Sequence, residues 1–144
     1  IRKDLGKDVE SVPGAGAAGG LGAGLMAFLG GRLVSGIQLV FRVLDFERQV
    51  QGADLVFTGE GKFDAQSAFG KVPVGVARAC RAFGIPVIVL AGTVTLDSEE
   101  LHGEGITASF SVLNQPMSLE EAMARTAELV EFQAAQVMRL WAHR

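Results

Sequence analysis

The stretch PVIVLA at residues 86–91 is the clearest strand signal in the chain. None of its residues is polar, so it lacks the alternation of a strand with one face in water, and we expect burial on both faces. Strands of this kind belong mostly to parallel sheets that carry helices on either side. The flanking segments follow the order strand, helix, strand, short helix, strand, helix. This order predicts an α/β fold with a parallel sheet, right-handed crossovers and flanking helices.

Shorter signals supply the other elements of this order. Two more strands are predicted, at residues 54–58 and at residues 106–112. Pro73 favours a helix start, because the N–H that proline lacks is not needed there. The sequence SLEE at residues 118–121 is a capping box, which predicts one long helix that runs to about residue 141. The apolar stripe of that helix is expected in the core and includes Leu119, Met123, Val137 and Met138.

The first part of the chain has a different composition, rich in glycine and alanine. Residues 12–31 carry no charge, and eight of these twenty residues are glycine. Such a run is too weakly apolar to make a reliable membrane span, so we expect no membrane partner. A helix is predicted at residues 21–29, ended by Gly30 and Gly31, and Ser35 is the expected cap of a second helix.

The glycine run begins with a G-x-G-x-x-G pattern at residues 14–19. A dinucleotide site needs a strand before this pattern and an acidic residue about twenty positions later, and the sequence offers neither. Small residues still leave backbone N–H groups open to a phosphate, and the positive end of the following helix would favour it. Close packing of the run against another backbone explains the glycines equally well. The candidate phosphate- or nucleotide-binding residues are Gly14, Gly16, Gly19 and Gly20.

Charge and cysteine content bear on partners and location. Thirteen Lys and Arg residues are scattered among sixteen Asp and Glu residues, with a net charge of −3, so we expect no nucleic-acid partner. The single cysteine, Cys80, cannot form an internal disulfide and favours a reducing, cytoplasmic location. The chain opens at Ile1 without an apolar signal sequence, and we expect it to begin inside a longer protein.

A dense group of polar side chains follows the strand predicted at residues 54–58. In the sequence TGEGKFDAQS, Glu60 and Asp64 could hold Mg²⁺, polarise a hydroxyl group or accept its proton. Gln66 and Ser67 could bind a carboxylate or a hydroxyl group. A hydrophilic turn with solvated charges would have a similar composition, but clustering at the end of a strand favours the functional interpretation.

The carboxyl ends of parallel strands meet at one edge of a sheet, where ligands of α/β proteins bind. Segments 59–71 and 92–95 both follow predicted strands, so we expect them to lie together at this edge. Lys71, at the end of the first segment, could face a phosphate group, although the sequence GKV there is not a Walker A ending.

Three segments in combination resemble the type I glycerate kinase family: the glycine run at residues 13–31, residues 52–80, and residues 86–94. The most specific is the pattern GEG-(K/R)-x-D-x-Q-(S/T)-x-x-GK-x-P, which this chain carries as GEGKFDAQSAFGKVP. Lys62 stands where the family often has arginine, which keeps the charge but loses the planar guanidinium group.

The resemblance implies a particular domain organisation. Members of this family are longer, with two α/β domains and an active site between them, so the chain resembles a C-terminal fragment of a two-domain kinase. Residues 1–51 would then be the C-terminal part of the inserted second domain, with its Gly-rich, helical segment. Residues 52–144 would be the C-terminal part of the Rossmann-like domain.

The resemblance also implies a reaction, the ATP- and Mg²⁺-dependent phosphorylation of a hydroxyl group of D-glycerate to phosphoglycerate. The expected partners are D-glycerate, ATP and the remainder of the same chain, and the fragment alone is expected to be inactive. Two alternatives stay open: a Rossmann-type nucleotide- or cofactor-binding module, and a non-catalytic remnant of a kinase. The expected catalytic residues are Glu60, Asp64 and Lys71, the expected substrate-binding residues are Lys62, Gln66 and Ser67, and the expected Mg²⁺ ligand is Asp64.

Overall fold

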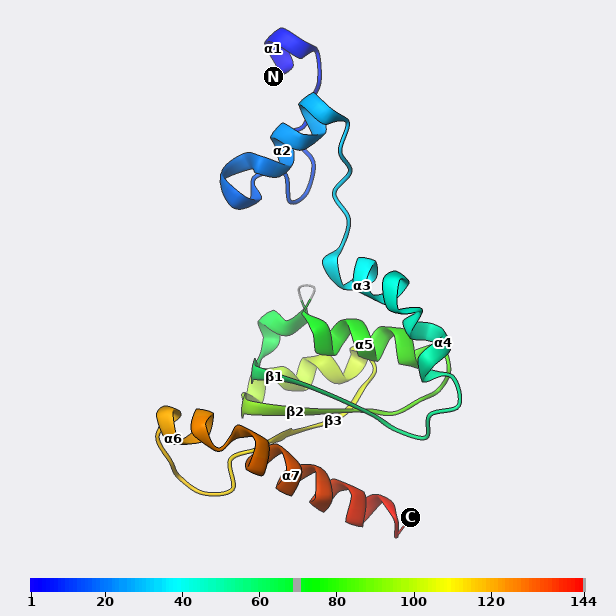
Figure 1. The fold of residues 1–144 in the computed structure, drawn as a ribbon, viewed down its shortest axis with the longest axis vertical. Coiled ribbons are helices and arrows are strands. Elements are labelled where there is room, and N and C mark those ends of the chain that lie inside the picture. The colour runs from blue at the N-terminus through cyan, green and yellow to red at the C-terminus, as the bar shows by residue number, and fades with distance from the viewer. Residues whose placement is uncertain (69–70, 144) are drawn as a thin grey trace. The chain divides into compact units, whose positions relative to one another are not determined.

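A computed structural model describes residues 1–68 and 71–143, and the chain divides into two units, Ile1–Leu39 and Val40–Arg144 (Figure 1). The helix α3 (Gly36–Leu44) crosses the boundary between them. In the second unit, Phe41 stacks on Phe46 with 4.3 Å between ring centroids, and both pack against the core of that unit. Residues 40–51 therefore pack with the sheet that follows them. The assignment of residues 1–51 and 52–144 to two kinase domains stays a prediction.

The first unit contains the helices α1 (Arg2–Leu5) and α2 (Ala17–Leu29). Helix α2 opens with a left-handed bend, with φ angles of 51°, 67° and 84° at residues 18–20. Regular helix follows and ends at Gly30, whose φ of 66° and N–H bond to the Leu25 carbonyl form a glycine C-cap. The helix predicted at residues 21–29 is confirmed. No helix in the described ranges has the length and apolarity needed to cross a membrane.

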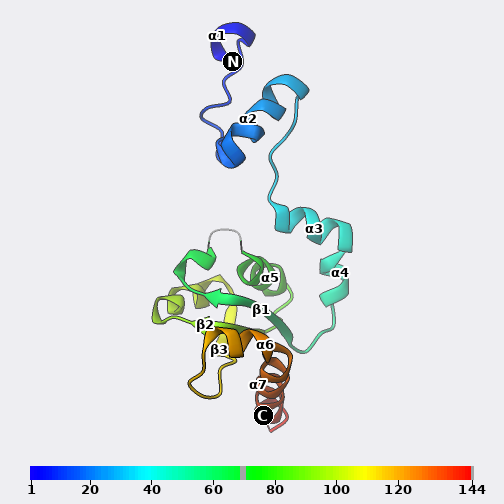
Figure 2. The same cartoon turned by 60° about the vertical axis from the view of Figure 1, so that its left-hand side comes forward.

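The second unit is built on three parallel strands in the order β1-β2-β3. They are β1 (Val56–Phe63), β2 (Val87–Val94) and β3 (Ile106–Ser111). Figures 1 and 2 show α5 on one face of this sheet and α7 on the other. The predicted parallel α/β sheet with flanking helices is confirmed. The remaining elements of the unit are α4 (Phe46–Val50), η1 (Ala65–Ala68), α5 (Val72–Arg81), η2 (Leu96–Glu104), α6 (Leu119–Ala124) and α7 (Thr126–Trp141).

The central strand β2 is buried on both faces, as its unbroken apolar sequence predicts. Residues 87–91 are all buried and alternate between two cores. Val87, Val89 and Ala91 pack with α5, while Ile88 and Leu90 pack with the face that carries α7. Burying a side chain of this size contributes about 1.5–3 kcal/mol, so the two cores together hold the sheet between its helices.

The strands β1 and β2 are longer than predicted, and this corrects the expected loop boundaries. Residues 59–63 and 92–94 continue the parallel ladder, with Glu60 opposite Ala91 and Lys62 opposite Thr93. A Cβ atom on Gly59 would lie 2.5 Å from the Leu90 carbonyl oxygen, and one on Gly92 would lie 2.7 Å from the Gly61 carbonyl oxygen. The glycines therefore permit close strand pairing here and do not end the strand.

The prediction of one long helix from residue 118 to about residue 141 is wrong in one respect. The helix is broken at Arg125, which has a φ angle of −105° and a ψ angle of 14°. The predicted cap is present, with Ser118 Oγ accepting the Glu121 N–H at 3.1 Å. After the break, the Thr126 hydroxyl donates to the carbonyls of Ala122 and Met123 at 3.0 and 2.9 Å. Such back-bonding by threonine bends helices.

The break also changes which side chains of this segment are buried. Leu119 and Met123 on α6 are 76% and 69% exposed, and Met138 is 43% exposed, so the prediction that they lie in the core is wrong. Val137 of the same stripe is buried, as predicted, and it packs on the sheet together with Leu129 of α7.

Replacing Gly59 with alanine should destabilise the chain by about 1–3 kcal/mol, because the new Cβ atom would be forced against a backbone carbonyl that cannot move without opening the sheet. Urea unfolding of the 144-residue chain measures the change. Gly61→Ala is the matched control, since nothing lies within 4 Å of a Cβ atom at Gly61. Equal stability of the two variants would contradict the close approach of the strands.

Candidate active site at the carboxyl edge of the sheet

Five polar side chains gather where β1 ends, and together they form the edge cluster: Glu60, Lys62, Asp64, Ser67 and Lys71. Glu60 and Lys62 belong to β1, and Asp64 comes directly after it. Ser67 lies on the short helix η1, and Lys71 is the N-cap residue of α5. The next strand ends beside them, since the Thr95 N–H donates to the Phe63 carbonyl at 3.1 Å. The expectation that segments 59–71 and 92–95 share one edge is confirmed for the described residues.

Ser67 organises the edge cluster. Its side chain is completely buried, and its hydroxyl donates to Glu60 Oε1 at 2.7 Å. The same oxygen accepts the backbone N–H of Asp64 at 3.3 Å and a hydrogen from Lys71 Nζ at 3.2 Å. A hydroxyl has one donor and two acceptor positions, so these three bonds use its full capacity. Ser67 thus holds Glu60, Asp64 and Lys71 in one arrangement, and its direct contact with a substrate stays a prediction.

The charges of the edge cluster balance. Lys71 Nζ lies 3.4 Å from Asp64 Oδ1 and 3.9 Å from Glu60 Oε2. Lys62 Nζ lies 3.0 Å from the other Asp64 oxygen. Asp64 is nearly buried, at 7% exposure, so it needs these cations to remain ionised. Two ammonium groups next to two carboxylates leave the cluster near neutral until a charged ligand arrives.

The pKa of Asp64 is lowered below its usual value. The hydrogen bond from Lys62 is the largest cause, and the charges of Lys71 and Lys62 add to it, while burial acts in the opposite direction. Asp64 is therefore a carboxylate at neutral pH and a weak base. A group of this kind suits binding a cation better than abstracting a proton.

The oxygen atoms of the edge cluster fit the chemistry of Mg²⁺. This ion is usually held in phosphoryl-transfer enzymes by one or two carboxylates, with water and substrate phosphates completing its shell. Glu60 and Asp64 supply two such carboxylates within reach of the same ammonium group. Among residues 1–68 and 71–143, no group of three or more His, Cys, Asp or Glu side chains is arranged to hold a metal. Binding of Mg²⁺ by Asp64 stays a prediction.

Gln66 belongs to the same motif but is not one of the five side chains of the edge cluster. Gln66 lies on η1 and its side chain is exposed. Phe69 and Gly70, which belong to the same motif, lie outside the described residues.

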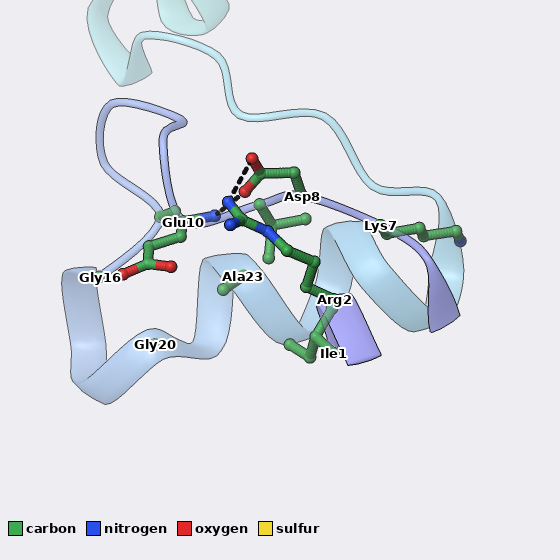
Figure 3. A pocket seen from close by; sticks show the side chains of 10 residues that line it. Ile1, Arg2, Lys7, Asp8, Glu10, Gly16, Gly20 and Ala23 are labelled. Carbon is green, nitrogen blue, oxygen red and sulfur yellow. Dashed lines mark hydrogen bonds and ion pairs between the residues drawn. The ribbon is translucent and has the colours of Figure 1, made fainter. Parts of the chain in front are cut away.

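The Gly-rich bend in the first unit borders a cavity of about 400 Å³ (Figure 3). Its charged lining consists of Arg2, Lys7, Asp8 and Glu10, so positive and negative groups are equal in number. Arg2 pairs with Asp8 at 2.5 Å, and Lys7 Nζ donates to the Ala27 carbonyl at 2.5 Å. The cavity therefore has no excess of positive charge for a phosphate.

The four candidate glycines differ in backbone conformation. Gly14, Gly19 and Gly20 have φ angles of 88°, 67° and 84°, which only glycine adopts readily, while Gly16 is right-handed. The N–H of Gly20 already donates to the carbonyl of Gly16 at 3.1 Å. Binding of phosphate by these residues stays a prediction.

The Rossmann-type cofactor module is disfavoured by the same region. Residues 1–55 are all described and contain no strand, and β1 begins only at Val56. The G-x-G-x-x-G pattern at residues 14–19 thus lacks the preceding strand that the dinucleotide fingerprint requires.

The model of the glycerate kinase family matches residues 1–142. A glycerate kinase of Halalkalibacterium halodurans is 49% identical over 136 residues, which is 94% of this chain and 36% of the relative. The glycerate 2-kinase of Escherichia coli is 52% identical over 122 residues, covering 85% of this chain and 32% of the relative. A crystal structure assigned as glycerate kinase 2 of Salmonella typhimurium has a TM-score of 0.74 at 40% identity, over 99% of this chain and 36% of that chain.

A parallel α/β sheet with charged groups at its carboxyl edge is the architecture of a ligand-binding α/β protein. The chain belongs to the glycerate kinase family, which confirms the resemblance of the motif segments. It spans about a third of the length of the curated relatives that it matches.

Removing Lys62 should raise the pKa of Asp64, because the strongest hydrogen bond to the carboxylate disappears. We expect Lys62→Met to raise this pKa more than Lys71→Met does, as measured by an NMR titration of the Asp64 side-chain carbon. Since the pKa of Asp64 is lower in the folded state, its ionised form stabilises the fold above the ordinary pKa of about 3.9. That stabilisation is lost as the pH falls through the lower folded-state value.

Unfolding measurements at several pH values provide the companion test. The stability difference between the wild type and Asp64→Asn should be constant near neutral pH and should shrink in acid. A difference that grows as the pH falls would contradict the assignment of Asp64 as an ion-paired carboxylate.

Proposed function

We propose that this chain forms part of a glycerate kinase, which transfers the γ-phosphoryl group of ATP to a hydroxyl group of D-glycerate. One observation carries the proposal: the segment most typical of the family gathers two carboxylates and two ammonium groups at the carboxyl edge of a parallel sheet. Relatives named glycerate kinase support the reaction class. The chain spans about a third of the length of those relatives, so the proposal concerns the activity of a longer protein that contains this chain.

Lys71 is the group best placed to bind the phosphoryl group that is transferred. Its side chain is 38% exposed, while its Nζ atom is held between Asp64 and Ser67. An ammonium group can donate three hydrogen bonds and accepts none. A phosphate oxygen can therefore take the place of a carboxylate oxygen at one of the long contacts of Lys71. Charge that develops on the transferred group in the transition state would be stabilised by this cation.

The two carboxylates would have different roles. Asp64, with its lowered pKa, would bind Mg²⁺ through the oxygen that now faces Lys62. Mg²⁺, when bound, would neutralise negative charge on the phosphates. Glu60, whose Oε1 is fixed by Ser67, would accept the proton of the attacking hydroxyl group. The glycerate oxygen would then bond to the γ-phosphorus, and the bond from that phosphorus to the bridging oxygen would break to release ADP.

Lys62 and Gln66 are the proposed contacts of the glycerate carboxylate. The side chain of Lys62 is 62% exposed and Gln66 is exposed, so both can reach a molecule at the edge cluster. If Asp64 bound Mg²⁺ in place of Lys62, the Lys62 ammonium group would need a new anionic partner. The glycines at positions 14, 16, 19 and 20 are proposed to contact the phosphates of ATP through their backbone.

The reaction can be tested in a chimera, in which this chain replaces the 136 matched residues of the Halalkalibacterium halodurans glycerate kinase. Asp64→Asn in the active chimera should lower turnover about a hundredfold, because a neutral amide cannot bind the metal or stabilise the transition state in the same way. ADP release in the presence of D-glycerate, ATP and Mg²⁺ measures turnover.

Glu60→Gln is the paired variant and should cause a similar loss if Glu60 is the base. Glu100→Gln is the matched control, since this exposed carboxylate on η2 lies outside the edge cluster. Turnover near the parental value in Asp64→Asn would exclude Asp64 from the chemistry. A folded chimera that binds no nucleotide and has no activity would support the alternative of a non-catalytic remnant.

The 144-residue chain by itself is expected to show no glycerate-dependent turnover. Its relatives are about three times as long, and preorganised positioning supplies most of the rate in phosphoryl transfer. The purified chain would be checked for folding by circular dichroism and then assayed for ADP release. Turnover of about 1 s⁻¹, the low end for kinases, would show that these residues hold a complete active site.

A further inference from the structure

A second cavity, of about 470 Å³, opens between the sheet and the helices α6 and α7. Most of its lining is apolar. Leu90 of β2 contributes from the sheet, and Val112 and Leu113 come directly after β3. Leu119 and Met123 of α6 form the side nearest to solvent. We call this space the edge cavity.

The floor of the edge cavity is formed by backbone. Gly59 and Gly61 of β1 and Gly92 of β2 all line it. A Cβ atom on Gly61 would meet nothing within 4 Å, so the space above that residue is open. The close strand approach explains why positions 59 and 92 are glycine, but it does not explain Gly61. A bare backbone floor lets a flat group approach the sheet closely.

The edge cavity and the edge cluster share Glu60. Glu60 lines the cavity and is bonded to Ser67 and paired with Lys71. Neighbouring residues of a strand point to opposite faces, so the Glu60 side chain lies on the α5 face with the edge cluster, while the edge cavity lies on the face that carries α7. A ligand that reaches both must pass over the carboxyl edge, with a flat apolar part on one side and an anionic part on the other.

We propose that the edge cavity binds the purine base of the nucleotide whose phosphates reach Lys71. Of the two substrates in the proposed function, on which this inference rests, only the nucleotide has both parts. D-glycerate carries a polar group on every carbon and would gain nothing from apolar walls. The volume of the cavity lies within the range of about 300–1,000 Å³ that is usual for small-molecule sites.

Methionine NMR of the full 144-residue chain tests the position of the base. The chain has four methionines, and a purine ring seated in the edge cavity would shift the methyl signal of Met123 through its ring current. Titration with adenosine, which has no phosphate, should shift Met123 and leave Met26 and Met138 unchanged. Met123→Leu assigns the signal. No shift of Met123 at saturating adenosine, or a shift confined to another methionine, would overturn the proposal.

Two variants of α6 provide a steric test. Ala122 lines the edge cavity, and Ala122→Phe should fill it and weaken adenosine binding by about tenfold or more. Ala124→Phe is the matched control, because this neighbouring residue of α6 is exposed and lies outside the lining. Unchanged adenosine binding in a folded Ala122→Phe would overturn the proposal.

The outcomes separate this inference from the proposed function. Adenosine binding that Ala122→Phe abolishes and Asp64→Asn preserves supports the base site, whatever the kinase assay gives. If the chimera phosphorylates glycerate with an unchanged KM for ATP in Ala122→Phe, the base lies elsewhere and the inference fails while the proposed function stands.

Discussion

The extended pairing of β1 with β2 determines where the charged side chains of this chain lie. Continuous register through Glu60, Lys62 and Phe63 carries the first strand past its two glycines to the level of Val94. Because of that length, Asp64 and η1 begin at the very edge of the sheet, and Ser67 can turn back onto Glu60. The glycines that allow this approach, Gly59 and Gly92, are thus as important to the site as its charged residues.

Burial of charge explains why the edge cluster has its particular composition. A carboxylate as buried as Asp64 would be unstable without cations, and Lys62 and Lys71 supply them at 3.0 and 3.4 Å. The same contacts keep the carboxylate ionised and ready for a cation. Ser67 satisfies groups on both sides of the cluster, so the site is organised by the protein's own hydrogen bonds before any ligand binds.

Much of the fold could be predicted from the sequence, because a segment that is buried on both faces can be recognised by its unbroken run of apolar residues. The unbroken apolar run at residues 87–91 predicts a strand with two covered faces, and the serine at position 118 predicts a helix start. The edge cluster could be located for the same reason, since polar residues after a buried strand lie at the carboxyl edge. The prediction that the first strand ends at residue 58 failed, because a glycine such as Gly59 can mark either a turn or a close backbone approach, and a single sequence does not separate the two uses.

The edge cavity could not be predicted from the sequence. Its walls come from segments distant in sequence, and Leu119 and Met123 look like core residues when the helix is taken as continuous. The break at Arg125 depends on local hydrogen bonds of Thr126, which helical periodicity does not register. The cavity therefore depends on long-range packing and on the hydrogen bonds of the Thr126 hydroxyl, and neither can be read from helical periodicity.

The most direct test of the central claim is a crystal structure of the active chimera with a non-hydrolysable ATP analogue, Mg²⁺ and D-glycerate. We expect the γ-phosphate within hydrogen-bonding distance of Lys71, Mg²⁺ bound to Asp64, and the acceptor hydroxyl group next to Glu60. Ligands bound away from the carboxyl edge, with the bonds of Ser67 and the ion pairs of Asp64 unchanged, would contradict the assignment of the edge cluster as the reaction centre.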